Sequence, residues 1–197
     1  MRVISDLYFV GKLYLPNVTT ATGQVSGLTQ LQSFIGIAEV EYLEAMFGYE
    51  LSKVIIAAID EFIAHATPIE VRIVNILTGA EFTDYSGRLQ KWKGLTRTEL
   101  ISPIAGYVYY GWQKDHASQS VIGGEVINEV ENSTNVGSAQ KICSNWNDAV
   151  SENRILMEFM RVNYSVYPEY HNGLYFGFSG GYMKRKELLT NINEFGI

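Results

Sequence analysis

Residues 28–63 read LTQLQSFIGIAEVEYLEAMFGYELSKVIIAAIDEFI, and this stretch decides the fold. Over residues 28–46 the apolar side chains recur at spacings of three and four residues, which is the period of one helix face. Over residues 51–63 the apolar stripe is broader, as in a helix with a large buried face. Gly48 lies between them, where a glycine commonly ends a helix. We therefore predict two consecutive helices that are neighbours, either antiparallel or steeply bent.

Three further segments have a helical period. Residues 67–70 read TPIE, the pattern of an N-terminal capping box, and predict a helix that ends near Gly79. Helices are also predicted from residues 102–103 onward and from about 138 to 163. Residues 81–93 alternate around a Tyr-Ser-Gly turn and predict a short hairpin. The fold class expected is mainly α: a helical bundle of four to five helices with one or two β-hairpins and extended arms.

The domain organisation follows from the segments that lack this period. Residues 1–27 alternate weakly up to Pro16 and are predicted to form an N-terminal extended arm or hairpin. Residues 28–173 form the helical domain, with a long polar loop at 118–135. Residues 174–197 are predicted to be a C-terminal hairpin and tail.

Composition excludes several classes of protein. The chain has 197 residues and a net charge of −6, and such an acidic chain is poorly suited to neutralising nucleic-acid phosphates. Its single cysteine, Cys143, excludes an intrachain disulfide and a cysteine-built zinc site. The longest apolar run, residues 54–59, is too short to cross a membrane, and Asp6 interrupts the place of a secretion signal. We expect no membrane association.

The residues that could carry chemistry each have a simpler structural interpretation. His65, His116 and His171 lack partners at metal-ligand spacing, so structural roles are favoured over metal binding. Cys143 is expected to be a small buried apolar residue rather than a nucleophile. The glycine-rich residues 177–184 lack the Walker spacing and favour a hairpin turn over a phosphate loop. Four glutamates of the first two predicted helices are expected to lie on a solvated helix face: Glu39, Glu41, Glu44 and Glu50. No catalytic residue, cofactor or metal is predicted, and we expect a protein that is not an enzyme.

Candidate residues for contacts with partners come from aromatic excess and from the arms. The chain has 13 tyrosines, which suit surfaces buried against partners but also fill half-buried positions within one chain. The basic run at 184–186 suits either an acidic partner surface or a solvated strand edge. The interface candidates are Tyr107, Tyr109, Tyr110, Val126, Ile127, Val130, Leu174, Phe176, Phe178, Lys184, Arg185 and Lys186.

A family resemblance is carried by three segments together: WKGL at 92–95, SPIAGYVYY at 102–110 and the Trp-Asn pair at 146–147. With the helical pair over residues 31–51 and the closing Gly196-Ile197, they resemble small structural proteins of tailed phages that infect gut Bacteroidales, including crAss-like phages. In size and layout the chain is similar to head–tail connector, or adaptor, proteins. The resemblance covers roughly two thirds of the chain; residues 1–27 and those after Gly173 do not match.

The resemblance implies a structural virion protein that forms a neck ring below the portal, bridges capsid and tail and lines the DNA channel. Its expected partners are other copies of itself in a dodecamer, the portal protein, and tail or further neck-ring proteins, with non-specific proximity to double-stranded DNA. The expected location is the head–tail junction of a virion made in the host bacterial cytoplasm. The alternatives are a tail-completion protein, a receptor-binding module or, less favoured, a metal-dependent hydrolase or nuclease accessory built on dispersed acidic residues.

Overall fold

A computed structural model describes residues 3–15, 27–97, 102–116, 118–121, 124–127, 136–170 and 185–193. The described residues are mainly helical and include two antiparallel β-hairpins, which confirms the predicted fold class. The α-helices are α1 (Gly27–Phe47), α2 (Tyr49–His65), α3 (Val71–Thr78), α4 (Pro103–His116) and α5 (Val136–Val162). The strands are β1 (Ala80–Thr83), β2 (Leu89–Trp92), β3 (Ser118–Val121) and β4 (Gly124–Ile127).

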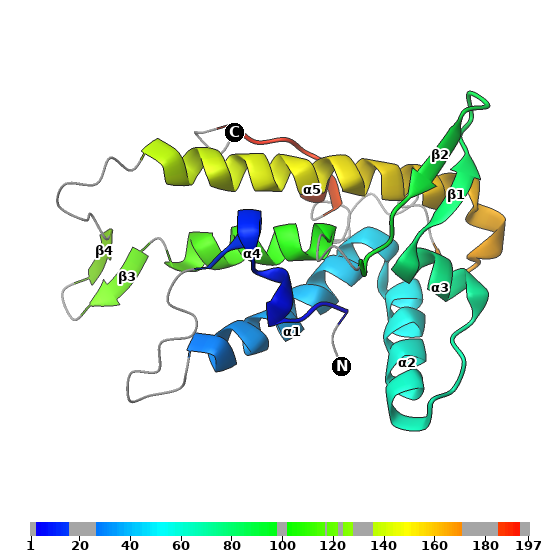
Figure 1. Ribbon diagram of the computed structural model, residues 1–197, viewed down its shortest axis with the longest axis horizontal. Coiled ribbons are helices and arrows are strands. Elements are labelled where there is room, and N and C mark those ends of the chain that lie inside the picture. The colour runs from blue at the N-terminus through cyan, green and yellow to red at the C-terminus, as the bar shows by residue number, and fades with distance from the viewer. Residues whose placement is uncertain are drawn as a thin grey trace.

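Three helices form the body of the molecule. Helix α4 packs against both α1 and α5, and the three run along the long axis (Figure 1). Their inward faces are fully buried at Ile35 and Tyr42 of α1 and at Val108 of α4. Gly106 of α4 faces Ala149 of α5 so closely that a Cβ there would lie 2.7 Å from the Cβ of Ala149. The small residues therefore set how near these two helices approach each other.

Helix α2 leaves the body steeply at Gly48 (Figure 1). The N–H of Gly48 donates to the carbonyl of Glu44 at 2.9 Å, and the positive φ of +80° turns the chain there. This confirms the predicted helical pair, in its bent form. Helix α2 buries Leu51, Ile55 and Ile59 on one side and leaves much of its far end exposed.

Helix α3 begins later than the capping box predicts. Its first residue is Val71 and its N-cap is Glu70, whose side chain makes no capping hydrogen bond. The Glu70 carboxylate instead accepts a hydrogen bond from Nε of Arg72 at 2.6 Å, and the Arg72 guanidinium also binds Glu169. The prediction of a box spanning Thr67 to Glu70 is wrong because an ion pair takes the glutamate. The end of the helix near Gly79 is as expected.

Hairpin β1–β2 is antiparallel and has Ala80 opposite Trp92, which confirms the hairpin predicted over residues 81–93. It packs on the far half of α5, where the rings of Phe82 and Phe159 meet edge to face at 5.6 Å. The Trp92 side chain is fully buried, and its indole N–H donates to the carbonyl of Ile76 at 2.9 Å. The hairpin is thus part of the core at its base.

The N-terminal segment, residues 3–15, differs from the expectation of an extended arm or hairpin. Residues Asp6–Tyr8 and Gly11–Leu13 form two 3₁₀ turns, and Ile4, Tyr8, Phe9 and Leu15 are buried. In this described part the weak apolar alternation therefore corresponds to short helical turns lying on α1, α4 and α5. Short 3₁₀ turns and strands are hard to separate by pattern over so few residues.

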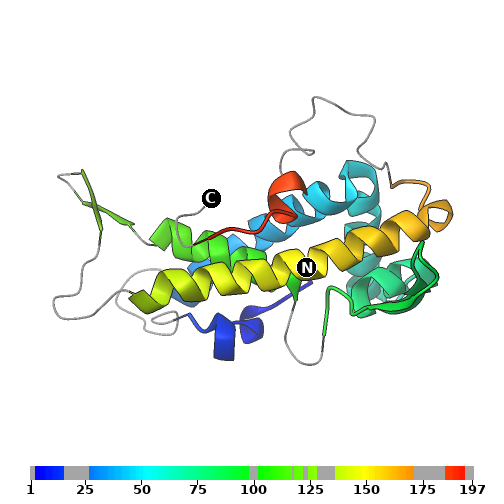
Figure 2. The ribbon, with the colours of Figure 1, turned by 90° about the horizontal axis from the view of Figure 1, so that it is seen from above.

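Hairpin β3–β4 lies beyond the end of α4, away from the three-helix body, in both views (Figures 1 and 2). It occupies the described part of the predicted 118–135 loop, with Ser118 opposite Ile127. The hairpin predicted around 174–178 lies outside the described residues, as do residues 16–26. No helix among the described residues is long and apolar enough to span a membrane.

Candidate functional site

A groove of about 530 Å³ lies between the N-terminal turns, the start of α4 and the middle of α5. Its walls include residues 10–13, Arg97 and the Ser102-Pro103 pair, and its α5 side runs from Asn145 to Glu152. The amide of Asn145 donates to the carbonyl of Lys12 at 3.0 Å and so attaches the N-terminal turns to α5.

The charged side chains of this groove are paired with one another. Glu152 accepts from Lys93 and from Arg97, each at 2.9 Å. Burial raises the pKa of the Glu152 carboxyl, but the hydrogen bonds and charges of these two cations outweigh it, so the net pKa is lowered. Lys12 and Asp148 form a longer, solvent-exposed pair at 3.5 Å. A carboxylate held ionised between two cations is a poor general acid or base at neutral pH.

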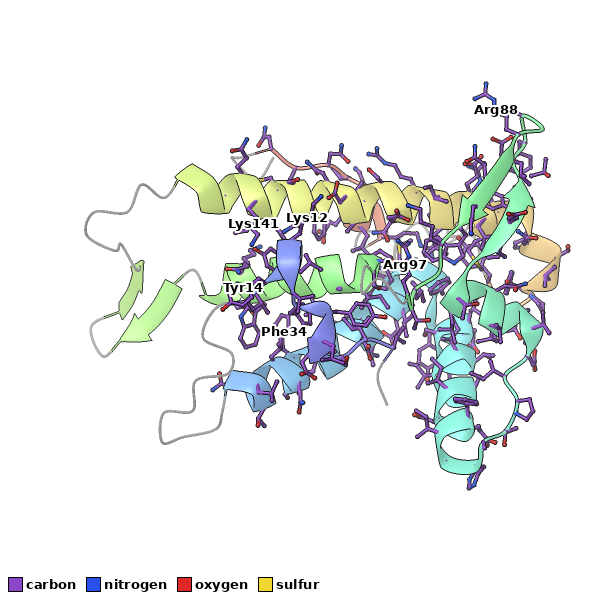
Figure 3. All side chains as sticks on the ribbon, in the orientation of Figure 1. Lys12, Tyr14, Phe34, Arg88, Arg97 and Lys141 are labelled. Atoms are coloured by element: carbon purple, nitrogen blue, oxygen red, sulfur yellow. The ribbon has the colours of Figure 1, made fainter. Side chains whose placement is uncertain are left out.

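Arg97 acts as a structural centre for this region. Its Nε donates to the carbonyl of Gly94 at 3.2 Å, and its guanidinium lies over the Trp92 ring at 5.9 Å. Its backbone N–H donates to the hydroxyl of Tyr8 at 3.2 Å. In Figure 3 Arg97 accordingly lies between the N-terminal segment and hairpin β1–β2, whereas Arg88 lies at the tip of that hairpin. The hydrogen bonds of Arg97 described above therefore all join parts of the same fold.

A second site lies along α5, where residues 185–193 run beside the helix (Figure 2). We call these residues the strap. The indole N–H of Trp146 donates to the carbonyl of Thr190 at 2.9 Å. The amide of Asn147 bonds Ile192 twice, donating to its carbonyl and accepting from its N–H, both at 2.9 Å. Arg154 donates to the carbonyl of Leu189 at 3.0 Å.

These contacts continue at both ends of the strap. The thiol of Cys143 donates to the carbonyl of Asn193 at 3.0 Å. The amide of Asn153 donates to the carbonyl of Leu188 at 2.9 Å, and its oxygen accepts from the buried hydroxyl of Tyr42. Side chains on one side of α5 therefore bind mainly the backbone of the strap, as a protein surface binds an extended peptide.

Two strap side chains anchor this segment in the core. Leu188 is buried, and Arg185 donates from Nε to the carbonyl of Ala45 at 2.8 Å while its guanidinium lies 5.6 Å from the Tyr170 ring centre. Arg185 is only 9% exposed. Its prediction as a surface contact is therefore wrong, because a carbonyl of α1 and an aromatic ring enclose it. Lys186 is exposed.

The tyrosines of α4 serve their own chain. Tyr109 is 2% exposed, which removes it from the surface. Tyr107 is half-buried, with its hydroxyl donating to Glu41 at 3.3 Å, and the Tyr110 ring lies 4.4 Å from that of Trp146. Tyr109 thus fits the simpler of the two interpretations, whereas Tyr107 and Tyr110 are partly exposed and stay candidates for a partner contact. Among the remaining candidates, Val126 and Ile127 lie on β4, while Val130, Leu174, Phe176, Phe178 and Lys184 lie outside the described residues.

Glu39 departs from the solvated face expected for the glutamates. It is 4% exposed, and its carboxylate accepts from the N–H of Ile4 at 2.7 Å, so it attaches the N-terminal segment to α1. Glu44 and Glu50 are exposed as expected. Cys143 is half-buried rather than buried, because it lies at the edge of the strap.

No group of three or more His, Cys, Asp or Glu side chains within the described ranges could hold a metal ion. His65 is the exposed last residue of α2, His116 ends α4, and His171 lies outside the described residues. The described histidines therefore sit at helix ends, where an imidazolium would complement the helix dipole.

Seven exposed apolar side chains lie on elements at the end of the molecule opposite hairpin β3–β4. This end contains the far part of α2, helix α3, hairpin β1–β2 and the 3₁₀ turn Tyr164–Val166 that follows α5 (Figure 1). We call these side chains the apolar end: Phe62, Ile63, Val71, Tyr85, Leu89, Tyr164 and Val166. Val71 is 75% exposed and Leu89 is 70% exposed.

Sequence reasoning missed the strap, although one signal was present. Asn145, Asn147 and Asn153 lie within a long helix, where asparagine is a poor helix former. Each of the three amides in fact binds a terminal segment of the chain.

Comparison of the chain with family models, with curated proteins and with solved structures finds no match in any of the three.

Proposed function

We propose that this protein is a non-catalytic structural subunit that assembles head to tail with copies of itself into a closed ring, as a head–tail connector of a tailed phage. The phage assignment and the twelvefold symmetry come from the family resemblance of the 92–95, 102–110 and 146–147 segments. In this proposal the ring lies below the portal, bridges capsid and tail and surrounds the DNA channel.

The observation that carries the assembly part is the difference between the two ends of the molecule. Hairpin β3–β4 projects from one end, and the apolar end lies at the other (Figure 1). A two-stranded hairpin is marginally stable in water by itself. In this proposal the hairpin of one copy contacts the apolar end of the next copy. Such a contact between two unlike surfaces is heterologous, and a closed series of these contacts forms a ring.

The groove beside α5 supports a structural role over a catalytic one. Its strongest charged cluster, Lys93–Glu152–Arg97, is held together by two ion pairs and joins the hairpin base to α5. The net charge of −6 is compatible with a channel through which DNA slides, because an acidic wall repels phosphates.

A mixing experiment with two variants tests the head-to-tail contact. One variant replaces residues 118–127 by a short Gly-Ser connection, and the other is the double variant Phe62→Lys, Val71→Lys. Neither should form rings alone. Mixed together they should form a dimer, because one intact hairpin can still meet one intact apolar end. Ile37→Lys, at a side chain that is 63% exposed on α1, is the matched control and should assemble normally. Ring formation by either variant alone would overturn the proposed contact.

The location in the virion is tested separately. Affinity-tagged protein expressed during infection should co-purify with portal and head, and electron microscopy should place it at the neck. Co-purification with distal tail parts would favour the receptor-binding alternative. A metal-dependent hydrolytic activity lost on changing any one Asp or Glu would favour the enzymatic alternative.

A further inference from the structure

The strap is held by contacts that any copy of this chain could make. The polar side of α5 binds mainly strap backbone, through hydrogen bonds from Asn153, Trp146 and Asn147 to carbonyls of residues 188, 190 and 192. The strap's own side chains add Leu188 and Arg185 as anchors. All of these contacts are contained in nine residues, so the segment forms a self-contained peptide ligand for α5.

The connection between strap and body does not restrict the strap to its own chain. Residues 171–184 separate the last described residue after α5, Tyr170, from Arg185, yet these two side chains are in contact at 5.6 Å. A connection of that length can extend to about 46 Å. The connection is therefore far longer than binding within one chain requires.

We propose that in the assembled state the strap of one copy occupies the strap-binding side of α5 in the next copy, an exchange of identical segments between neighbours. In dilute solution the strap binds its own α5. Once a neighbour is held in place, the strap-binding side of its α5 lies within reach at a high effective concentration, and the exchanged strap makes the same bonds while linking two subunits. The proposal rests on the proposed self-assembly and adds a second contact to it.

Cysteine crosslinking tests the exchange, because Cys143 is the single cysteine and its thiol lies 3.0 Å from the carbonyl of Asn193. Unmodified chain, which carries Cys143, is co-expressed with a differently tagged Cys143→Ser, Asn193→Cys variant. The assembled protein is oxidised with copper-phenanthroline and separated on a non-reducing gel. A disulfide between the two tagged chains forms only when a strap has crossed to a neighbour.

The matched control is Cys143→Ser, Glu187→Cys, whose new thiol lies on an exposed strap residue outside the contact with Cys143. We expect a strong heterodimer band with the Asn193→Cys partner and at least a tenfold weaker band with the control. The single variant Asn193→Cys, which keeps Cys143, should give mainly an intrachain crosslink in dilute monomer and interchain ladders in the assembly.

Two outcomes would overturn the exchange. Rings that give an intrachain crosslink alone would overturn it while leaving the proposed function intact. A chain that stays monomeric at every concentration, and in the virion, would overturn both.

Discussion

Gly79 and Gly94 lie back to back, and neither has room for a side chain. A Cβ on Gly79 would overlap the carbonyl oxygen of Trp92 and lie 3.0 Å from the nitrogen of Gly94, while a Cβ on Gly94 would lie 2.7 Å from the nitrogen of Gly79. Both have positive φ, +97° and +92°. This pair brings the end of α3 against the end of β2 and so fixes where the hairpin leaves the core.

The first prediction concerns Gly79→Ala, which we expect to lower the free energy of unfolding by about 4 kcal/mol, through backbone strain plus steric overlap. Gly48→Ala is the matched control. Its φ of +80° and ψ of 163° resemble the +97° and 161° of Gly79, but a Cβ there would meet nothing within 4 Å. It should cost about 2 kcal/mol, from strain alone. Urea unfolding measures both values, and equal losses would contradict the overlap.

The second prediction concerns the bond that joins α1, α5 and the strap. Asn153→Ala removes the acceptor of Tyr42 and the donor to Leu188, both buried, and should lower the free energy of unfolding by about 3 kcal/mol. Tyr42→Phe should cost about 1 kcal/mol, and the double variant should cost less than the sum because the two share one bond.

The strap itself gives a second measurement for Asn153→Ala. Limited proteolysis within residues 185–193 should become faster in this variant, because the strap loses a central contact. Asn163→Ala is the control, since its amide donates to Phe159 at the end of α5, away from the strap. Equal proteolysis in both variants would show that Asn153 does not hold the strap.

The third prediction concerns the paired charges of the groove. Glu152→Ala leaves Arg97, whose side chain is 7% exposed, without its carboxylate partner. We expect it to lower the free energy of unfolding by about 3 kcal/mol. Lys93→Ala removes the other partner of Glu152, but Lys93 is 55% exposed, so about 0.5 kcal/mol is expected. Thermal unfolding of the two variants checks the order, and a larger loss for Lys93→Ala would contradict it.

The fourth prediction is a pH dependence of hairpin β1–β2. Hydrogen bonds from the Ser86 hydroxyl and the Arg88 backbone N–H lower the pKa of Asp84 from 3.8 to about 2. Because the folded-state pKa is below the unfolded value, the stabilisation is complete above about pH 4 and is lost as the pH falls towards 2. Carbon-detected NMR titration of the Asp84 carboxyl should give this midpoint, and a midpoint near 3.8 would contradict the turn geometry.

The long helices could be predicted from sequence because the burial of one face leaves a period. Leu31, Ile35 and Tyr42 recur at helical spacing, and all three are buried. Local polar patterns were less informative, because the same residue type has several partners to choose from. Glu70 matches a capping residue and pairs with Arg72, and Glu39 matches a surface residue and binds the N–H of Ile4.

The strap could not be predicted from its own residues, because side chains that bind a distant backbone impose no pattern on the segment they bind. Thr190 and Ile192 contribute carbonyls, which every residue has. Two of the interface candidates, Tyr109 and Arg185, are buried for a related reason: they have the composition of a partner surface, but the surface they meet is another part of the same chain.

The position of the strap along α5 also determines when the contacts of this helix can form during synthesis on the ribosome. Residues 188–192 are synthesised after α1 and α5, so Asn153, Trp146 and Asn147 must wait for their partners until nearly all of the described chain has emerged. A product of translation that stops before Arg185 would leave the site of Leu188 uncovered and an apolar surface open to proteases. The strap thus distinguishes copies whose synthesis has passed Arg185 from copies that stopped before it.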